Sequence, residues 1–89
     1  MTMADDSRVR RVVEVLAQAL TDHPEQVRVT ESTHRGTTLV ELYVAPGQLG
    51  RVIGRQGRTA AALRTLAASA GEQEGKKVTL EIRDGKPAL

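Results

Sequence analysis

The sequence predicts a small α+β domain in which helices cover one face of a three-stranded sheet. Three observations support this fold class: an amphipathic helical pattern near the N-terminus, three segments with the alternation typical of strands, and two helical segments between the second and third strands. The predicted order is αββααβ, which favours a two-layer arrangement. With 89 residues the chain is expected to form a single domain. We expect an ordered core over about residues 7–83, with short tails at both ends.

The first helix is predicted from about Ser7 to Leu20, because apolar residues recur there every three or four positions. Asp5, Asp6 and Ser7 can cap its first turn, and the two carboxylates complement the positive end of the helix dipole. Pro24 cannot continue the hydrogen-bond ladder, so the helix is expected to end before it. The residues on its expected buried side are Val9, Val12, Val13, Leu16 and Leu20.

Alternation of apolar and polar residues predicts three strands, over Gln26–Ser32, Thr37–Val44 and Lys77–Arg83. Only the short turn at residues 33–36 separates the first two, and Gly36 can take a positive φ there. These two strands are therefore expected to pair as an antiparallel hairpin. The positions expected to face the core are Val27, Val29, Val40, Leu42, Val44, Val78, Leu80 and Ile82.

Two helices are predicted between the second and third strands, over Gln48–Ile53 and from Arg58 to about Ala70. The segment Gly54–Gly57 interrupts them. Gly71 is expected just past the end of the second helix, where glycine readily supplies a left-handed conformation, and residues 72–76 are expected to form a polar loop. The residues available for the buried side of this helix are Ala60, Leu63, Leu66, Ala67 and Ala70.

Charge is distributed unevenly along the chain. No acidic residue lies between Glu41 and Glu72, and this window contains four arginines: Arg51, Arg55, Arg58 and Arg64. The rest of the chain carries nine basic and eleven acidic residues, so its net charge is −2 although the whole chain has +2. A basic window in an otherwise acidic chain indicates an anionic partner.

The segment Gly54–Gly57 lies at the centre of this window. Its glycines allow the backbone of another molecule to approach closely, and the amides that begin the following helix favour phosphate. Arg55 lies in the loop, while Arg51, Arg58 and Arg64 lie within one or two helical turns of it and can add charge. Glycine spacing alone is a weak signal, because such glycines can simply turn the chain. The absence of nearby acids favours binding of a nucleic-acid backbone.

Residues 52–57, VIGRQG, resemble the VIGxxG signature of KH domains. The order αββααβ resembles the type II, bacterial KH arrangement, and the likeness extends from about Ser7 to Arg83. The longer run from Gly50 to Thr59 and the short chain resemble in particular the KhpA-like group of small bacterial KH proteins. One departure is that Ala60, Ala61 and Ala62 follow the signature, so that the first large apolar residue is Leu63.

The resemblance implies a protein that binds single-stranded RNA. Gly54, Arg55, Gln56 and Gly57 would hold about four nucleotides by their backbone, and the bases would rest in a groove lined by Leu49, Val52 and Ile53. It further implies an RNA chaperone or post-transcriptional regulator that forms a homodimer and acts with a KhpB-like RNA-binding protein. In that family the complex is linked to cell elongation and peptidoglycan homeostasis.

Composition argues against several other classes. The chain has no cysteine for disulfides or thiolate sites, and Tyr43 is its only aromatic residue, so the sheet lacks the stacking platforms of RRM domains. His23 and His34 belong to no metal-ligand motif, and no serine has evident catalytic partners. We therefore expect no metal, cofactor, small-molecule substrate or enzymatic activity. Without an apolar run of membrane-spanning length, we expect a cytoplasmic protein that has no membrane partner.

A second hypothesis is that the glycine-rich helix pair is mainly a protein–protein seam. Small residues at positions 60–62 and 67–70 would allow another helix to approach closely. The chain would then be a dimerisation module of a ribonucleoprotein or ribosome-assembly complex. RNA binding and dimerisation are compatible with each other.

Overall fold

The computed structural model describes residues 7–87, and its elements follow the predicted order αββααβ. The helices are α1 (Arg8–Leu20), α2 (Leu49–Ile53) and α3 (Arg58–Gln73), and single 3-10 turns occupy Pro24–Gln26 and Arg55–Gly57. The strands are β1 (Arg28–His34), β2 (Thr37–Val44) and β3 (Lys77–Asp84). Asp5 and Asp6, which were expected to help cap α1, lie outside the described residues.

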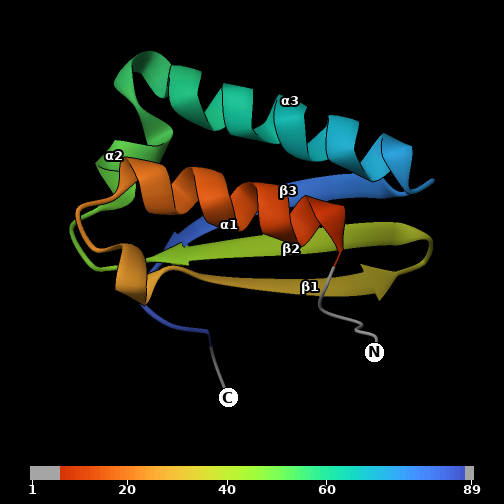
Figure 1. Cartoon of the computed structure of the whole chain (residues 1–89), viewed down its shortest axis with the longest axis horizontal. Helices are drawn as coiled ribbons and strands as arrows, with labels where there is room; N and C mark the ends of the chain where they lie inside the picture. The colour runs from red at the N-terminus through yellow and green to blue at the C-terminus, as the bar shows by residue number, and fades with distance from the viewer. Residues whose placement is uncertain (1–6, 88–89) are drawn as a thin grey trace.

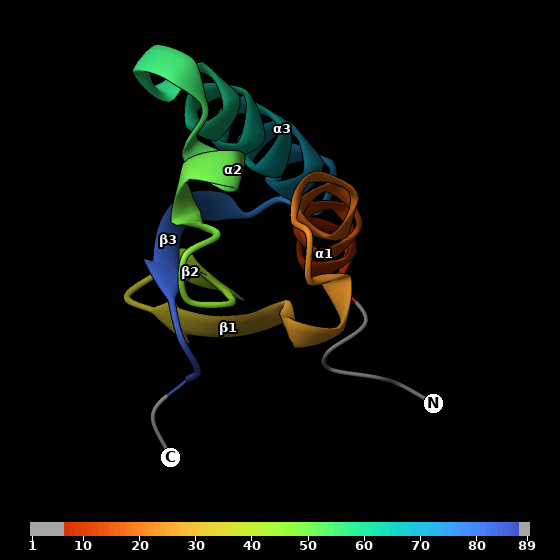
Figure 2. The ribbon, with the colours of Figure 1, turned by 90° about the vertical axis from the view of Figure 1, so that its left-hand side faces the viewer.

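The three strands form one mixed sheet in the order β1-β2-β3. β1 pairs antiparallel with β2, which confirms the predicted hairpin, and β3 pairs parallel with β2. α1 and α3 contact each other and lie on the same face of the sheet, which confirms the predicted two-layer fold (Figures 1 and 2).

The hairpin turn is shorter than predicted. β1 begins and ends two residues later than expected, because Pro24–Gln26 forms a 3-10 turn and His34 still pairs with Thr37. The turn itself consists of Arg35 and Gly36, whose φ angles are 53° and 80°. Two successive left-handed residues form the tight turn that matches the twist of a hairpin.

The core lies between the sheet and the helices. Val40, Leu42 and Val44 project from β2 towards α1 and α3, and all three are fully buried, as the alternation predicted. Leu20 and Leu66 differ from expectation, because they are 36% and 46% exposed. Helical residues that are buried against the sheet or against another helix are Val9, Val13, Ala17, Val52, Ala60, Leu63, Ala67 and Gly71.

Gly71 does not end α3, contrary to the prediction. The helix continues to Gln73, so residues 72 and 73 are not part of the loop, and the chain turns at Gly75, whose φ is 67°. Gly71 is buried because β3 crosses close to it: a Cβ at this position would lie 3.1 Å from the Lys76 carbonyl oxygen and would collide with the Val78 side chain. This glycine therefore allows helix and strand to approach closely.

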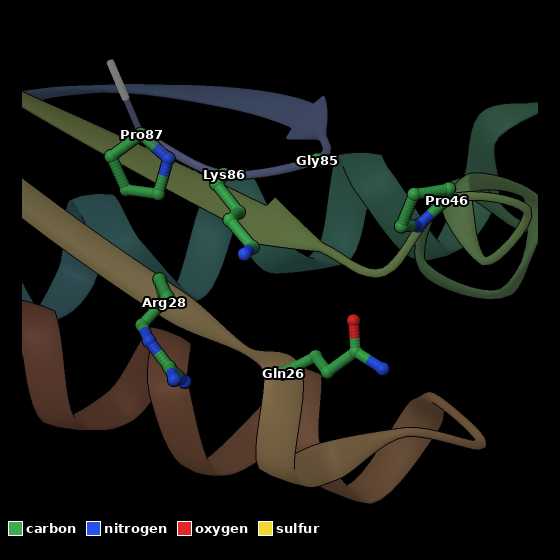
Figure 3. A pocket seen from close by; sticks show the side chains of 6 residues that line it. All are labelled: Gln26, Arg28, Pro46, Gly85, Lys86 and Pro87. Atoms are coloured by element: carbon green, nitrogen blue, oxygen red, sulfur yellow. The ribbon is translucent and has the colours of Figure 1, made fainter. Parts of the chain in front are cut away.

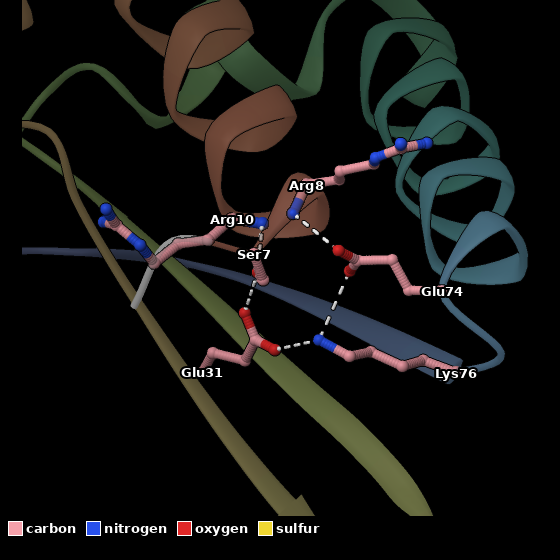
Figure 4. A network of polar contacts seen from close by, with 6 residues as sticks. All are labelled: Ser7, Arg8, Arg10, Glu31, Glu74 and Lys76. Carbon is pink, nitrogen blue, oxygen red and sulfur yellow. Dashed lines mark hydrogen bonds and ion pairs between the residues drawn. The ribbon is translucent and has the colours of Figure 1, made fainter. Parts of the chain in front are cut away.

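A polar network ties the start of α1 to β1 and to the α3–β3 loop (Figure 4). The Ser7 hydroxyl accepts a hydrogen bond from the Arg10 amide at 3.0 Å, which caps α1, and donates one to Glu31. Lys76 Nζ lies 3.0 Å from Glu31 Oε2 and 3.3 Å from Glu74 Oε1.

Two pKa values respond to this network. The hydrogen bond from the Arg8 amide to Glu74 Oε2, at 3.2 Å, lowers the pKa of Glu74. The hydrogen bond to Glu31 raises the pKa of Lys76. The network therefore joins three separate chain segments through groups that are stabilised in their charged forms.

Candidate functional site

The segment Gly54–Gly57 forms a tight loop between α2 and α3 at one corner of the molecule (Figures 1 and 2). Three of its four residues have positive φ angles: 76° at Gly54, 57° at Gln56 and 73° at Gly57. Hydrogen bonds from the Gly54 amide to the Gly50 carbonyl, at 2.9 Å, and from the Gly57 amide to the Gly54 carbonyl, at 3.1 Å, hold this shape. We refer to residues 54–57 as the clamp loop.

The two glycines of the clamp loop have different tasks. A Cβ at Gly54 would lie 2.7 Å from the Thr59 Cβ, so this glycine is required inside the protein. A Cβ at Gly57 would meet nothing within 4 Å, and the same holds for Gly50 in α2. Gly50 and Gly57 therefore leave bare backbone facing solvent, which is where a second molecule gains the closest approach.

Only part of the predicted cationic set lies at the clamp loop. Arg55 is exposed, and within residues 7–87 its side chain makes no hydrogen bond or ion pair. Arg58 donates from Nη2 to Gln56 Oε1 at 2.7 Å, so these two side chains form one exposed unit at the start of α3.

The other two arginines are engaged elsewhere. Arg51 Nη2 lies 3.0 Å from Asp22 Oδ2, and both side chains are more than half exposed. Arg64 donates from Nε to the Leu80 carbonyl of the edge strand β3 at 3.4 Å. No acidic residue lies within this window of the sequence, but in the folded protein Asp22, which follows α1, lies beside Arg51.

The predicted apolar lining separates into two kinds of residue. Leu49 and Ile53 are partly exposed beside the clamp loop and can contact a ligand. Val52 is fully buried in the core. It has no surface to offer to a base, because α2 turns this side chain towards the sheet. Val52 therefore belongs to the core, and of the predicted lining only Leu49 and Ile53 are partly exposed.

Gln48 positions α2 against α1, a role that the sequence did not reveal. Its side-chain oxygen accepts hydrogen bonds from Thr21 Oγ1 at 2.9 Å and from the Asp22 amide at 2.7 Å. This contact also brings Asp22 next to Arg51. No sequence pattern announces it, since the partners are separated by 26 to 29 residues.

Within residues 7–87, the structure contains no group of three or more histidine or acidic residues suited to hold a metal ion. The same part of the chain has no helix with the length and apolarity needed to cross a membrane. The chemistry available at the clamp loop therefore consists of bare glycine backbone, guanidinium groups and a small aliphatic surface.

Comparison with known proteins identifies what the chain resembles. The model of the KhpA/KhpB KH domain matches residues 10–82, which include the clamp loop. The RNA-binding protein KhpA of Aquifex aeolicus is 47% identical over 85% of this chain and 96% of its own length. RNA-binding proteins KhpA from Clostridium perfringens and Mycobacterium bovis are 43% and 46% identical over 83% and 81% of this chain, and over 99% and 86% of their own lengths.

A solved structure has the same fold. A variant of Aquifex aeolicus Era bound to GDP and AlF4− superposes with a TM-score of 0.59 and 16% identity, over 89% of this chain and 31% of that protein. At this level of identity the likeness concerns the fold alone.

Proposed function

The chain belongs to the KhpA/KhpB family of KH domains, and from this premise we propose that it binds single-stranded RNA and catalyses no reaction. The observation that carries the proposal is the clamp loop, where a run of positive φ angles exposes glycine backbone beside the unpaired Arg55. The names of the KhpA relatives from Aquifex aeolicus and Clostridium perfringens, each an RNA-binding protein, support it.

In the proposed mechanism the clamp loop holds the RNA backbone. The strand approaches Gly57 and Gly50, where no side chain intervenes. Arg55 pairs with a phosphate, and the Arg58–Gln56 unit contacts the next phosphate and its sugar. About four nucleotides would be held in this way. If three phosphates are neutralised, the slope of log K against log salt is about −2 for a single strand.

The bases of the held nucleotides would rest against Leu49 and Ile53, between α2 and the edge of β3. Arg64 of α3 reaches that edge, where it donates a hydrogen bond to the Leu80 carbonyl. No aromatic side chain is available there for stacking, because Tyr43 belongs to β2 and is 9% exposed. Affinity for a short RNA is therefore expected to be modest and to depend on backbone contacts.

The clamp proposal is tested by reversing the charge of the loop. We expect the double variant Arg55→Asp, Gln56→Asp to lose binding of a single-stranded RNA at moderate salt while its unfolding transition is unchanged, because both side chains are exposed. The matched control is His34→Asp, Arg35→Asp. It changes the charge by the same amount at neutral pH on the exposed hairpin turn, at the other end of the sheet (Figure 1). Retained RNA binding by the loop variant would refute the clamp.

We further propose that the protein acts in the cytoplasm as an RNA chaperone or post-transcriptional regulator together with a KhpB-like protein. Family membership supports this, since one family model describes the KH domains of both KhpA and KhpB. Cell elongation and peptidoglycan homeostasis are the processes in which we place the pair. Copurification of a KhpB-like protein with this chain from its own cells, before and after RNase treatment, would test the pairing and its dependence on RNA.

A homodimer is our second functional proposal, and the outer face of α1 and α3 is the surface that favours it. Val15 is 61% exposed there and Leu66 46%, beside a shallow hollow bounded by Arg11, Val12, Val15, Leu16 and Leu66. In the seam of small residues considered from the sequence, Ala60 and Ala67 are buried in the protein's own core, whereas Ala61, Ala62 and Ala68 are exposed.

Sedimentation of the purified chain tests the dimer. We expect Leu66→Glu to shift the protein from dimer to monomer, because it places a charge in the apolar contact. Thr79→Glu in β3, away from this surface, introduces the same charge and is the matched control, which should leave the dimer intact. A wild-type protein that sediments as a monomer at all concentrations would contradict the proposal.

A further inference from the structure

A second hollow lies beside the segments that follow β2 and β3, where the sheet ends (Figure 3). Its volume is about 380 Å³, and its lining consists of Gln26, Arg28, Pro46, Gly85, Lys86 and Pro87. The clamp loop and its neighbours contribute nothing to it. We call it the sheet-end hollow.

Backbone hydrogen bonds hold two of the segments that line the sheet-end hollow. The Gly85 amide donates to the Val44 carbonyl at 2.8 Å, which keeps the segment after β3 beside the end of β2. The Gln26 amide donates to the His23 carbonyl at 3.0 Å, which fixes the 3-10 turn that carries Gln26. The hollow is thus a feature of the ordered backbone rather than of side chains alone.

Two cations of the hollow remain without an acidic partner. Arg28 donates from Nη1 to the Glu25 carbonyl at 2.9 Å and to the Val27 carbonyl at 2.8 Å, so its guanidinium is held in place while its charge is not neutralised. Lys86 makes no ion pair within residues 7–87.

Two acidic residues on the same face of the sheet, Glu41 and Glu81, form ion pairs with Arg83. Glu41 Oε2 lies 3.2 Å from Arg83 Nε, and Glu81 Oε1 lies 3.5 Å from Arg83 Nη2. Arg28 and Arg83 flank Tyr43 in the register of the sheet, so all three project to the face that the helices leave uncovered. Arg28 and Lys86 therefore give the hollow a positive charge.

The remaining lining is suited to a flat group with a polar edge. Pro46 and Pro87 present rigid apolar rings, and the Gln26 amide, which extends into the hollow in Figure 3, can both donate and accept hydrogen bonds. The fixed positive charge suits a phosphate. The apolar walls suit the face of a base, and the amide suits the edge of a base.

We propose that the sheet-end hollow binds one nucleotide, with its phosphate at Arg28 and Lys86, its base between Pro46 and Pro87, and the base edge at Gln26. The nucleotide belongs to the RNA strand held by the clamp loop, so this inference rests on the proposed function. Pro46 of the hollow precedes α2 along the chain and the clamp loop follows it directly, as the connections on either side of α2 in Figure 2 show. The five residues of α2 span only about 7.5 Å.

A salt series with two lengths of RNA tests the second contact. The molecule is 32 Å in its longest dimension, so a strand of about twelve nucleotides at 3.4 Å each is long enough to reach both sites. A strand of about four nucleotides fills the clamp loop alone. The variant is Arg28→Gln, Lys86→Gln, and the matched control Arg35→Gln, Lys77→Gln removes two exposed cations at the other end of the sheet.

We expect the Arg28→Gln, Lys86→Gln variant to bind the longer RNA more weakly, with a salt slope shallower by about 0.7, because the hollow neutralises one phosphate of the strand. Its binding of the short RNA should equal that of the wild type, and the control should match the wild type on both. An unchanged slope with the longer RNA, or an equal loss with both lengths, would overturn the proposal.

A second measurement separates this inference from the clamp. In the Arg55→Asp, Gln56→Asp protein, adenosine or uridine monophosphate should shift the NMR signals of the Gly85 amide and the Gln26 side chain, and the shifts should vanish when Arg28 and Lys86 are also replaced by Gln. This result is expected even if the protein binds no RNA through the clamp loop. Absence of shifts, or equal shifts with inorganic phosphate alone, would refute a nucleotide site.

Discussion

Arg51 of α2 forms an ion pair with Asp22 at the end of α1, with 3.0 Å between Nη2 and Oδ2. Both side chains are more than half exposed, so the pair is accessible to a competing phosphate. Exposed pairs of this kind contribute only about 0.2–1 kcal/mol. We therefore expect Arg51 to leave Asp22 for an RNA strand at little cost, and we expect Asp22 to weaken binding by competing with the phosphate.

We predict that Asp22→Asn strengthens RNA binding about 1.5- to 5-fold at low salt, which corresponds to the release of one exposed pair. Arg51→Gln should weaken binding and make the salt slope shallower by about 0.7. Fluorescence anisotropy with a labelled single-stranded RNA measures both. If Asp22→Asn does not change RNA affinity in a protein that already carries Arg51→Gln, the gain in affinity comes through Arg51. An equal gain with and without Arg51→Gln would show that it comes from Asp22 alone.

The two glycines of the clamp loop should respond differently to alanine. Gly54→Ala is expected to destabilise the fold by about 1–3 kcal/mol, because φ of 76° with ψ of 174° is a region that suits glycine alone, and the new Cβ would also collide with Thr59. Gly57→Ala meets no atom within 4 Å, so it should cost less stability and mainly obstruct the RNA backbone.

Urea unfolding and RNA binding of both variants separate these effects. Replacing Thr59 with Ala in the Gly54→Ala background removes the contact with Oγ1 but keeps the Thr59 Cβ at 2.7 Å and the strained φ, so it should recover only a small part of the lost stability. Equal losses of stability at Gly54 and Gly57 would contradict the different roles that we assign to them.

The sequence predicted the elements whose signals are local. Alternation placed β2 at Thr37–Val44 with the observed bounds, and the glycine pair located the clamp loop between α2 and α3. Contacts between distant segments were not accessible in this way. The burial of Val52 and the exposure of Leu66 depend on how α2 and α3 sit on the sheet, and a helical pattern alone leaves both faces possible.

Gly71 shows how one residue type supports two local interpretations. Glycine is common just past the end of a helix, which led to the prediction that α3 stops there. The structure uses Gly71 instead for close packing against β3, and Gly75 four residues later makes the left-handed turn. Only the path of β3 distinguishes these roles, and that path is a property of the whole fold.

Gly71→Ala is therefore predicted to destabilise the protein, although alanine in place of glycine inside a helix normally gains about 1 kcal/mol. The added methyl group would collide with Val78, and overpacking typically costs about 1–3 kcal/mol. The double variant Gly71→Ala, Val78→Ala should be more stable than Val78→Ala alone. Thermal unfolding measures this difference. A simple gain of stability in Gly71→Ala would show that β3 can move away without penalty.

The network of Glu31, Glu74 and Lys76 predicts how stability depends on pH. The pKa of Glu74 is lowered in the folded state, chiefly by the Arg8 amide, so this carboxylate stabilises the fold above its usual pKa of 4.5. That contribution is lost as pH falls through the lowered value. The pKa of Lys76 is raised, chiefly by Glu31, so its contribution is present below 10.5 and is lost only as pH rises through the raised value.

Urea unfolding between pH 3 and pH 7 therefore isolates Glu74. We expect Glu74→Gln to reduce the free energy of unfolding at pH 7. As the pH falls through the lowered pKa of Glu74, the difference in stability between the wild type and this variant should shrink. The stability of the variant should accordingly fall less steeply than that of the wild type as the solution is acidified. Glu72→Gln is the matched control, because Glu72 is exposed on the last turn of α3. If Glu74→Gln and Glu72→Gln follow the same pH profile, the Arg8 contact does not hold Glu74 in solution.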